Sequence, residues 1–184
     1  LSGAHLSYGD FKEATFTGMG AVKLKGAGLA HADLSGSRLT AQATEFDGLG
    51  GELRTGEATI DFSGANLTHA DLSGSKLVAD GRRSDENFYY KYYEGSYENY
   101  GAIINFIGAD LAHADLRGSE LIAKNSYGDA SIDFSGANLA HADLGGSKLT
   151  TQTVNGEATM DFTDTMNADL SDSTYDSMLI IQPM

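Results

Sequence analysis

Large apolar residues recur at every fifth position in four stretches of this chain, residues 24–39, 62–77, 106–121 and 134–149. In the first stretch they are Leu24, Leu29, Leu34 and Leu39. In the other three they form what we call the core ladder: Phe62, Leu67, Leu72, Leu77, Phe106, Leu111, Leu116, Leu121, Phe134, Leu139, Leu144 and Leu149. A spacing of five matches neither the helical period of 3.6 nor the strand period of 2. It indicates a chain that turns a corner every five residues.

Four such sides close one coil of a square column, and each stretch supplies four sides. We expect the apolar residue of each side to point inward, together with the Ala or Ser that usually precedes it by two positions. One coil cannot bury its own core, so stability must come from stacking on its neighbours. Looser copies at 2–16 and 160–175, the second with a two-residue deletion, bring the count to about six coils. At a strand spacing of roughly 4.8 Å the column would be about 29 Å tall.

Extra residues separate the coils at one corner. The steps from the last apolar centre of one stretch to the first of the next are 8, 23, 29, 13 and 13 residues, where an uninterrupted path needs five. In 121–134 and 149–162, polar turn residues divide two alternating segments, and Asn155-Gly156 is a strong two-residue hairpin signal. We expect β-hairpins here, stacked beside the column as a fin. Irregular surface loops are the alternative.

A single solenoid domain is expected to span residues 1–184, with a tyrosine-rich insertion at 78–105. This insertion contributes the candidate interface residues Tyr89, Tyr90, Tyr92, Tyr93, Tyr97 and Tyr100. Aromatic side chains with polar tips favour interfaces, although packing against the column wall explains them equally well. A second candidate interface is the C-terminal apolar run with Met178, Leu179, Ile180 and Ile181. The alternative there is a strand folded back over its own column.

Short triplets inside the stretches carry a family resemblance. They are Ala65-Asn66-Leu67, Ala70-Asp71-Leu72, Ala109-Asp110-Leu111, Ala114-Asp115-Leu116, Ala137-Asn138-Leu139 and Ala142-Asp143-Leu144, and they resemble the A(D/N)LXX signature of pentapeptide-repeat proteins. The resemblance implies an all-β fold, a right-handed quadrilateral β-helix. It also implies no common enzymatic activity, and some members of the family are acidic DNA mimics that bind type II topoisomerases. This chain departs from the pattern by its insertions and by the lack of an evident C-terminal dimerisation helix.

Four histidines, His31, His69, His113 and His141, occupy one position of the four stretches, each two residues before an aspartate. Equivalent residues of stacked coils lie about 4.8 Å apart, so the imidazoles should form an outward column. A zinc ion needs ligands that converge at about 2.0–2.1 Å. Repetition of a consensus by duplication is therefore the favoured interpretation, and no metal ligand is predicted.

Aspartates form two further series directly before apolar centres: Asp33, Asp71, Asp115 and Asp143, and also Asp61, Asp133 and Asp161. Asp and Asn at corners accept hydrogen bonds from nearby backbone N–H groups, which explains most of them. No cofactor is expected. Calcium bridging between adjacent acid rungs is the one alternative that the chemistry leaves, because calcium takes six to eight oxygen ligands. The sequence contains no EF-hand loop and no Gly-Gly-x-Gly-x-Asp repeat.

The composition narrows the range of partners. A net charge of −14 and a pI near 4.5 argue against direct binding to nucleic acid or to an anionic membrane surface. The chain has no cysteine, and no apolar run approaches the roughly 20 residues of a membrane span. Because the sequence starts at Leu1, we expect either removal of a leader, as in a secreted or cell-surface protein, or a segment of a longer chain.

No nucleophile elbow, phosphate loop or dinucleotide fingerprint is present, so we expect no enzyme. The sequence favours a structural or scaffold protein that assembles head to tail, into a filament or array, through the ends of the solenoid. Its partner would be another copy of itself or another protein. The alternative is an acidic DNA mimic, because 14 charges over about 29 Å approach the one charge per about 1.7 Å of duplex DNA.

Overall fold

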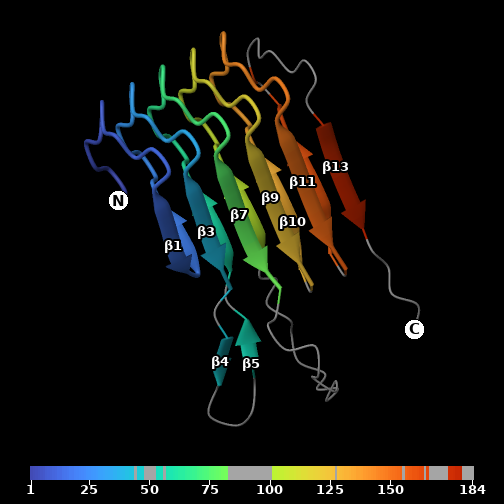
Figure 1. Ribbon diagram of the computed structural model, residues 1–184. Coiled ribbons are helices and arrows are strands. Elements are labelled where there is room, and N and C mark those ends of the chain that lie inside the picture. The colour runs from blue at the N-terminus through green and yellow to red at the C-terminus, as the bar shows by residue number, and fades with distance from the viewer. Residues whose placement is uncertain are drawn as a thin grey trace.

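Parallel strands form nearly all of the regular structure (Figure 1). The computed structural model describes residues 1–43, 45–47, 53–55, 57–82, 101–126, 128–154, 156–163, 165 and 174–179, with the backbone alone at 45–47, 53–55 and 174–179. One parallel sheet contains, in spatial order, β1 (Thr15–Met19), β3 (Arg38–Gln42), β7 (Lys76–Gly81), β9 (Glu120–Asn125), β11 (Lys148–Thr153) and β13 (Thr174–Leu179). The other contains β2 (Ala21–Lys23), β6 (Ala58–Asp61), β8 (Ala102–Asn105), β10 (Ala130–Asp133) and β12 (Ala158–Asp161).

Successive coils supply successive strands of each sheet, and we number the coils by their strand in the six-stranded sheet, from β1 in the first to β13 in the sixth. Leu77 pairs with Leu39 on one side and with Leu121 on the other, so equivalent residues stack from coil to coil. The two sheets face each other across the core, joined at one end of every complete coil by tight corners. This arrangement confirms the predicted all-β column of stacked parallel coils.

Three tight corners per coil produce the five-residue spacing. In the third coil the carbonyls of Phe62, Leu67 and Leu72 each accept a hydrogen bond from the N–H three residues later, at 2.9–3.0 Å. The third residue of each turn has a positive φ: 61° at Gly64, 56° at His69 and 61° at Gly74. Positive φ at this turn position normally requires glycine, which two of the corners supply. The third corner uses histidine in four consecutive coils.

The interior consists of single columns of identical or similar side chains. All twelve side chains of the core ladder are at most 1% exposed, and the small residues between them, such as Ala65 and Ala70, are buried to the same degree. The rings of Phe62, Phe106, Phe134 and Phe162 stack with centroids 4.7–5.1 Å apart and 1–9° between planes. Stacking from coil to coil thus removes from water a core that one coil alone would expose.

The two late insertions are not hairpins, and that prediction is wrong. β9 and β10 lie in different sheets, and so do β11 and β12. The chain runs along one sheet, turns, and returns along the other, with Ala123 and Ile132 fully buried between them. An alternating pattern around a polar turn fits such facing strands as well as it fits a hairpin, because each strand has one buried face in either case. The insertions therefore lengthen the core instead of forming a fin.

A hairpin does exist in the earlier insertion. β4 (Glu45–Asp47) and β5 (Leu53–Thr55) pair antiparallel beyond the ends of β3 and β7 in Figure 1, which confirms the hairpin expected between the second and third coils. Of the insertion 78–105, residues 78–82 and 101–105 are described and largely extend β7 and β8. Its remaining residues lie outside the described part of the chain.

The end coils follow the predicted register. Phe16 pairs with Leu39 at one end, and Leu149 pairs with Tyr175 at the other. Asp133 pairs with Asp161, so a step of 28 residues shortens to 26 before β13, which confirms the two-residue deletion. β13 also agrees with the alternative of a C-terminal strand folded back on the column. The described residues contain no helix long and apolar enough to cross a membrane.

Candidate functional site: the outer face of the first coil

The aspartate series are engaged with their own backbone, as predicted. Asp33 Oδ1 accepts hydrogen bonds from Ser35 N at 2.9 Å and Ser35 Oγ at 2.6 Å. The same two-residue pattern recurs, at 2.8–3.0 Å, at Asp71, Asp115, Asp143, Asp61, Asp133 and Asp161. Each carboxylate thus stabilises the start of a corner.

Hydrogen bonds to the ionised form lower the pKa of several of these carboxyls. The Ser35 hydroxyl, followed by the Ser35 backbone N–H, lowers the pKa of Asp33. The Arg117 guanidinium lowers the pKa of Asp115 in the same way. Among the described residues no three His, Asp or Glu side chains converge on a point that could hold a metal ion. The carboxylates are therefore explained by local structure, and calcium receives no support from their arrangement.

The histidines form the outward column that the repeat predicts. The ring centroids of His31, His69, His113 and His141 are 4.7–4.9 Å apart, and adjacent ring planes differ by 4–13°. Tyr8 extends the column into the first coil, with its ring 4.8 Å from that of His31. Parallel rings at this spacing do not converge as zinc ligands do. The sequence analysis missed Tyr8, although it follows Leu6 by two residues, as His31 follows Leu29.

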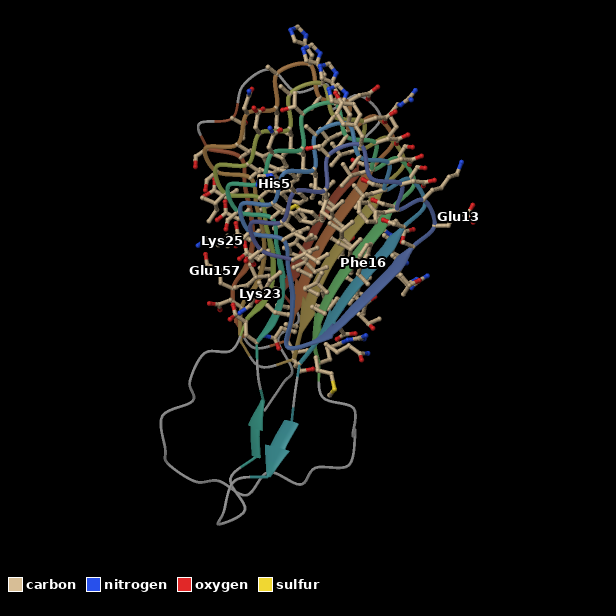
Figure 2. All side chains as sticks on the ribbon, turned by 90° about the vertical axis from the view of Figure 1, so that its left-hand side faces the viewer. His5, Glu13, Phe16, Lys23, Lys25 and Glu157 are labelled. Carbon is tan, nitrogen blue, oxygen red and sulfur yellow. The ribbon has the colours of Figure 1, made fainter. Side chains whose placement is uncertain are left out.

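The first coil presents backbone groups that no described strand pairs with. Between the first two coils, the N–H groups of Gly28, Asp33 and Arg38 donate to first-coil carbonyls at 2.8–2.9 Å. By the register, the equivalent N–H groups of the first coil are those of His5, Asp10 and Thr15. These groups face away from the second coil, on the side shown in Figure 2. An edge of this kind is a template for pairing with another strand.

Exposed apolar side chains gather on the same coil. Large apolar residues that are exposed in the described part of the chain are Leu1 (60%), Tyr8 (77%), Met19 (80%) and Ile107 (43%). The first three belong to the first coil and only Ile107 lies elsewhere. Phe16, which lies between the two sheets in Figure 2, is only partly buried, in contrast to the fully buried core ladder. An apolar surface beside an unpaired strand edge is typical of a protein–protein contact.

Charge is divided unevenly along the column. Residues 1–43 contain four Lys and Arg against three Asp and Glu, a net charge of +1. The remaining residues contain eight Lys and Arg against 23 Asp and Glu, a net charge of −15. Residues 157–184 contain six acidic residues and no Lys or Arg. The two ends of the column therefore differ in charge, and Lys23 and Lys25 lie at the rim of the first coil in Figure 2.

The predicted interface residues have different outcomes. Tyr89, Tyr90, Tyr92, Tyr93, Tyr97 and Tyr100 lie outside the described residues, as do Ile180 and Ile181. Met178 and Leu179 belong to β13, where their backbone positions pair with Gln152 and Thr153 of β11. They are thus part of the sheet and not of a free tail.

Comparison with known proteins agrees with the repeat geometry. A family model described as pentapeptide repeats, in eight copies, matches residues 60–78 and 131–151. Both segments contain the same succession of inward side chain, small residue and tight corner. The chain is a pentapeptide-repeat protein. No curated protein matches this pentapeptide-repeat chain.

Solved structures with some similarity include two other pentapeptide-type proteins. HetL, a pentapeptide repeat protein involved in heterocyst differentiation regulation from the cyanobacterium Nostoc sp. strain PCC 7120, is 22% identical, with 94% of this chain and 81% of HetL covered and a TM-score of 0.23. Full-length QnrB1, a plasmid-mediated fluoroquinolone resistance protein, is 16% identical, with 96% and 91% covered and a TM-score of 0.22. At these low scores the roles of HetL and QnrB1 say nothing about the role of this pentapeptide-repeat protein.

Proposed function

We propose that this pentapeptide-repeat protein is a non-enzymatic structural subunit that assembles through the end faces of its column. The observation that carries the proposal is the outer face of the first coil, where unpaired N–H groups at His5, Asp10 and Thr15 lie beside exposed apolar side chains. Pentapeptide-repeat proteins are generally non-enzymatic, which agrees with this role.

Pairing with another strand would satisfy these backbone groups and cover the apolar surface in one step. A backbone hydrogen bond contributes about 0.5–1.5 kcal/mol net, and apolar burial about 25 cal/mol per Å². The contact would repeat the geometry that already joins the coils, so no rearrangement of the column is needed. A rigid, pre-formed edge loses little conformational entropy on association.

The distribution of charge favours assembly over mimicry of DNA. Duplex DNA carries charge of one sign at a constant spacing. Here the first 43 residues are close to neutral while the rest carries a net −15. The β4–β5 hairpin also breaks the outline of a plain rod. An acidic mimic would instead require an even acidic surface along the whole column.

The proposal is tested on the full chain with substitutions that leave the core intact. We expect Tyr8→Asp and Met19→Asp to reduce assembly strongly, because each places a charge on the outer face of the first coil. Asp tolerates the positive φ of 59° at Tyr8. Ile107→Asp is the matched control, since Ile107 is also exposed but lies away from this coil. Light scattering across concentration, paired with negative-stain electron microscopy, measures the outcome.

Assembly that is lost in the two first-coil variants and retained in Ile107→Asp supports the proposal. A wild-type protein that remains monomeric at high concentration rules it out. In that case a competition assay with a DNA-binding enzyme such as a type II topoisomerase tests the alternative of DNA mimicry, and salt-sensitive inhibition would support it.

A further inference from the structure

Resting on the proposed function, we infer the partner and the register of the contact. The outer face of the first coil binds the sixth coil of a second copy, with β1 parallel to β13 and Phe16 opposite Tyr175. Internal pairings place Phe16, Leu39, Leu77, Leu121, Leu149 and Tyr175 in one column that runs from β1 to β13. Its two terminal positions are therefore Phe16 and Tyr175, and a second copy in this register continues the column without a break.

The direction of the strands requires a head-to-tail contact. All six strands of the larger sheet are parallel, and among the described residues β1 and β13 each have a partner on one side only. Joining β13 of one copy to β1 of the next keeps every strand parallel. A head-to-head contact would set two β1 strands against each other and end the growth at a dimer. The head-to-tail contact leaves a free face on each copy, so it propagates as a filament.

Charge complementarity selects the same pair of faces. The sixth coil belongs to residues 157–184, with six acidic residues and no Lys or Arg. The first coil and the corner after it carry Lys12, Lys23 and Lys25 against Asp10 and Glu13. Two sixth coils would repel each other, whereas a first coil meets a sixth coil with charge of opposite sign. Opposite potentials both steer association and suppress the wrong orientation.

The hydrogen-bond pattern between coils fixes which backbone groups meet. Inside the column Arg38, the partner of Thr15, donates its N–H to the carbonyl of Ala14, one residue before that partner. In the inferred contact Thr17 of the second copy is the partner of Asp176. Its N–H therefore donates to the carbonyl of Tyr175. A shift of the contact by one residue would interchange the inward and outward sides of β1 and expose Phe16.

Cysteine crosslinking tests this register directly, because the chain contains no native cysteine. Two full-length single variants, Thr17→Cys and Asp176→Cys, are mixed and oxidised. In the inferred register their Cα atoms lie about 5 Å apart, within the range for a disulfide. The matched control mixes Thr15→Cys with Asp176→Cys, which adds two residues or roughly 6.6 Å along the strand and takes the pair beyond that range.

The inferred contact predicts a disulfide-linked heterodimer from Thr17→Cys with Asp176→Cys, at least tenfold more abundant than from the control mixture. Equal yields, or a higher yield from the control, overturn the register while light scattering still shows assembly. Thr17→Cys crosslinking to itself in place of Asp176→Cys overturns the head-to-tail direction. If no mixture crosslinks and scattering shows only monomer, the proposed assembly itself fails.

Discussion

Gly156 lies directly over the carbonyl of Gly128 in the neighbouring coil. A Cβ atom at position 156 would come within 2.2 Å of Gly128 O and 2.4 Å of Gly128 C, which are backbone atoms that cannot rotate away. Thr153 Oγ1 also donates to Gly128 O at 2.7 Å, so the carbonyl is held on a second side. The turns at the far ends of two coils are thus in direct contact.

Substitution of Gly156 should therefore destabilise the fourth and fifth coils. We expect Gly156→Ala to lower the free energy of unfolding by about 1–3 kcal/mol, the usual range for overpacking. Gly28→Ala is the control, since a Cβ there meets no atom closer than 3.7 Å and its partner in the next coil is Asn66. Urea unfolding followed by circular dichroism measures both. Equal stability of the two variants would contradict the close contact.

The phenylalanine column should be sensitive to loss of volume. Phe106 is fully buried between the rings of Phe62 and Phe134. Phe106→Ala should cost about 3–5 kcal/mol, because a cavity in a stacked column cannot collapse easily. Phe106→Leu should cost markedly less, since Leu24 fills the equivalent place in the second coil. A calorimetric scan that ranks the two variants alike would show that the column adapts.

The histidine corners should prefer residues that accept a positive φ. His113 has φ 58° and an exposed side chain. We expect His113→Gly to be neutral or stabilising by up to about 1 kcal/mol, and His113→Val to destabilise by about 1–2 kcal/mol. The melting temperature of each variant reports the difference. If His113→Gly were clearly destabilising, the stack with its neighbours at 4.7–4.8 Å would contribute more than the backbone strain costs.

Acid should weaken the fold through the corner carboxylates. The pKa values of Asp33 and Asp115 are lowered by hydrogen bonds, first of all from the side chains of Ser35 and Arg117. A lowered folded-state pKa gives stability that is present above the unfolded pKa and is lost as the pH falls through the folded pKa. The free energy of unfolding should therefore decrease below about pH 4.

Asp115→Asn tests the origin of this acid sensitivity. It retains an oxygen that can accept the backbone N–H and removes the titration, as Asn66 already does with Thr68 N at 3.0 Å. We expect the variant to be less stable than the wild type at pH 6 and closer to it at pH 3. A stability gap that does not change with pH would assign the acid sensitivity to other groups.

The charge of the first coil should control the association of copies. The double variant Lys23→Glu with Lys25→Glu should raise the protein concentration needed for assembly at least tenfold, because both faces would then be acidic. Lys124→Glu with Lys148→Glu changes the net charge equally on β9 and β11 and should have little effect. Added salt should weaken wild-type assembly by screening. Light scattering at two ionic strengths would contradict the model if both double variants behaved alike.

The repeat region could be predicted from sequence because one spacing determines every corner. Each apolar centre is followed two residues later by Gly or His at positive φ, and is often preceded by an Asp or Asn that accepts a backbone N–H. These local signals agree with one another, so Leu67 and Leu72 have a single satisfactory environment. The column of histidines follows from the same register without further information.

The long arms could not be predicted because their pattern is ambiguous. The segment that ends in Asn125 and the one that begins at Ala130 alternate in polarity, as both a hairpin and two facing strands do. The Asn155-Gly156 pair was equally ambiguous, since glycine serves a hairpin turn and also a close backbone contact. The long-range proximity of Gly156 to Gly128 decides between them, and no local pattern encodes it.

Every variation in coil length enters at the arm tips. Successive coils of the larger sheet are 23, 38, 44, 28 and 26 residues apart, yet their registers remain continuous. The column is therefore indifferent to how much sequence is inserted at that one place. Foreign peptides, binding loops or whole small domains could be grafted there without disturbing the interior, and copies of such a graft would be displayed at a regular spacing along an assembled fibre.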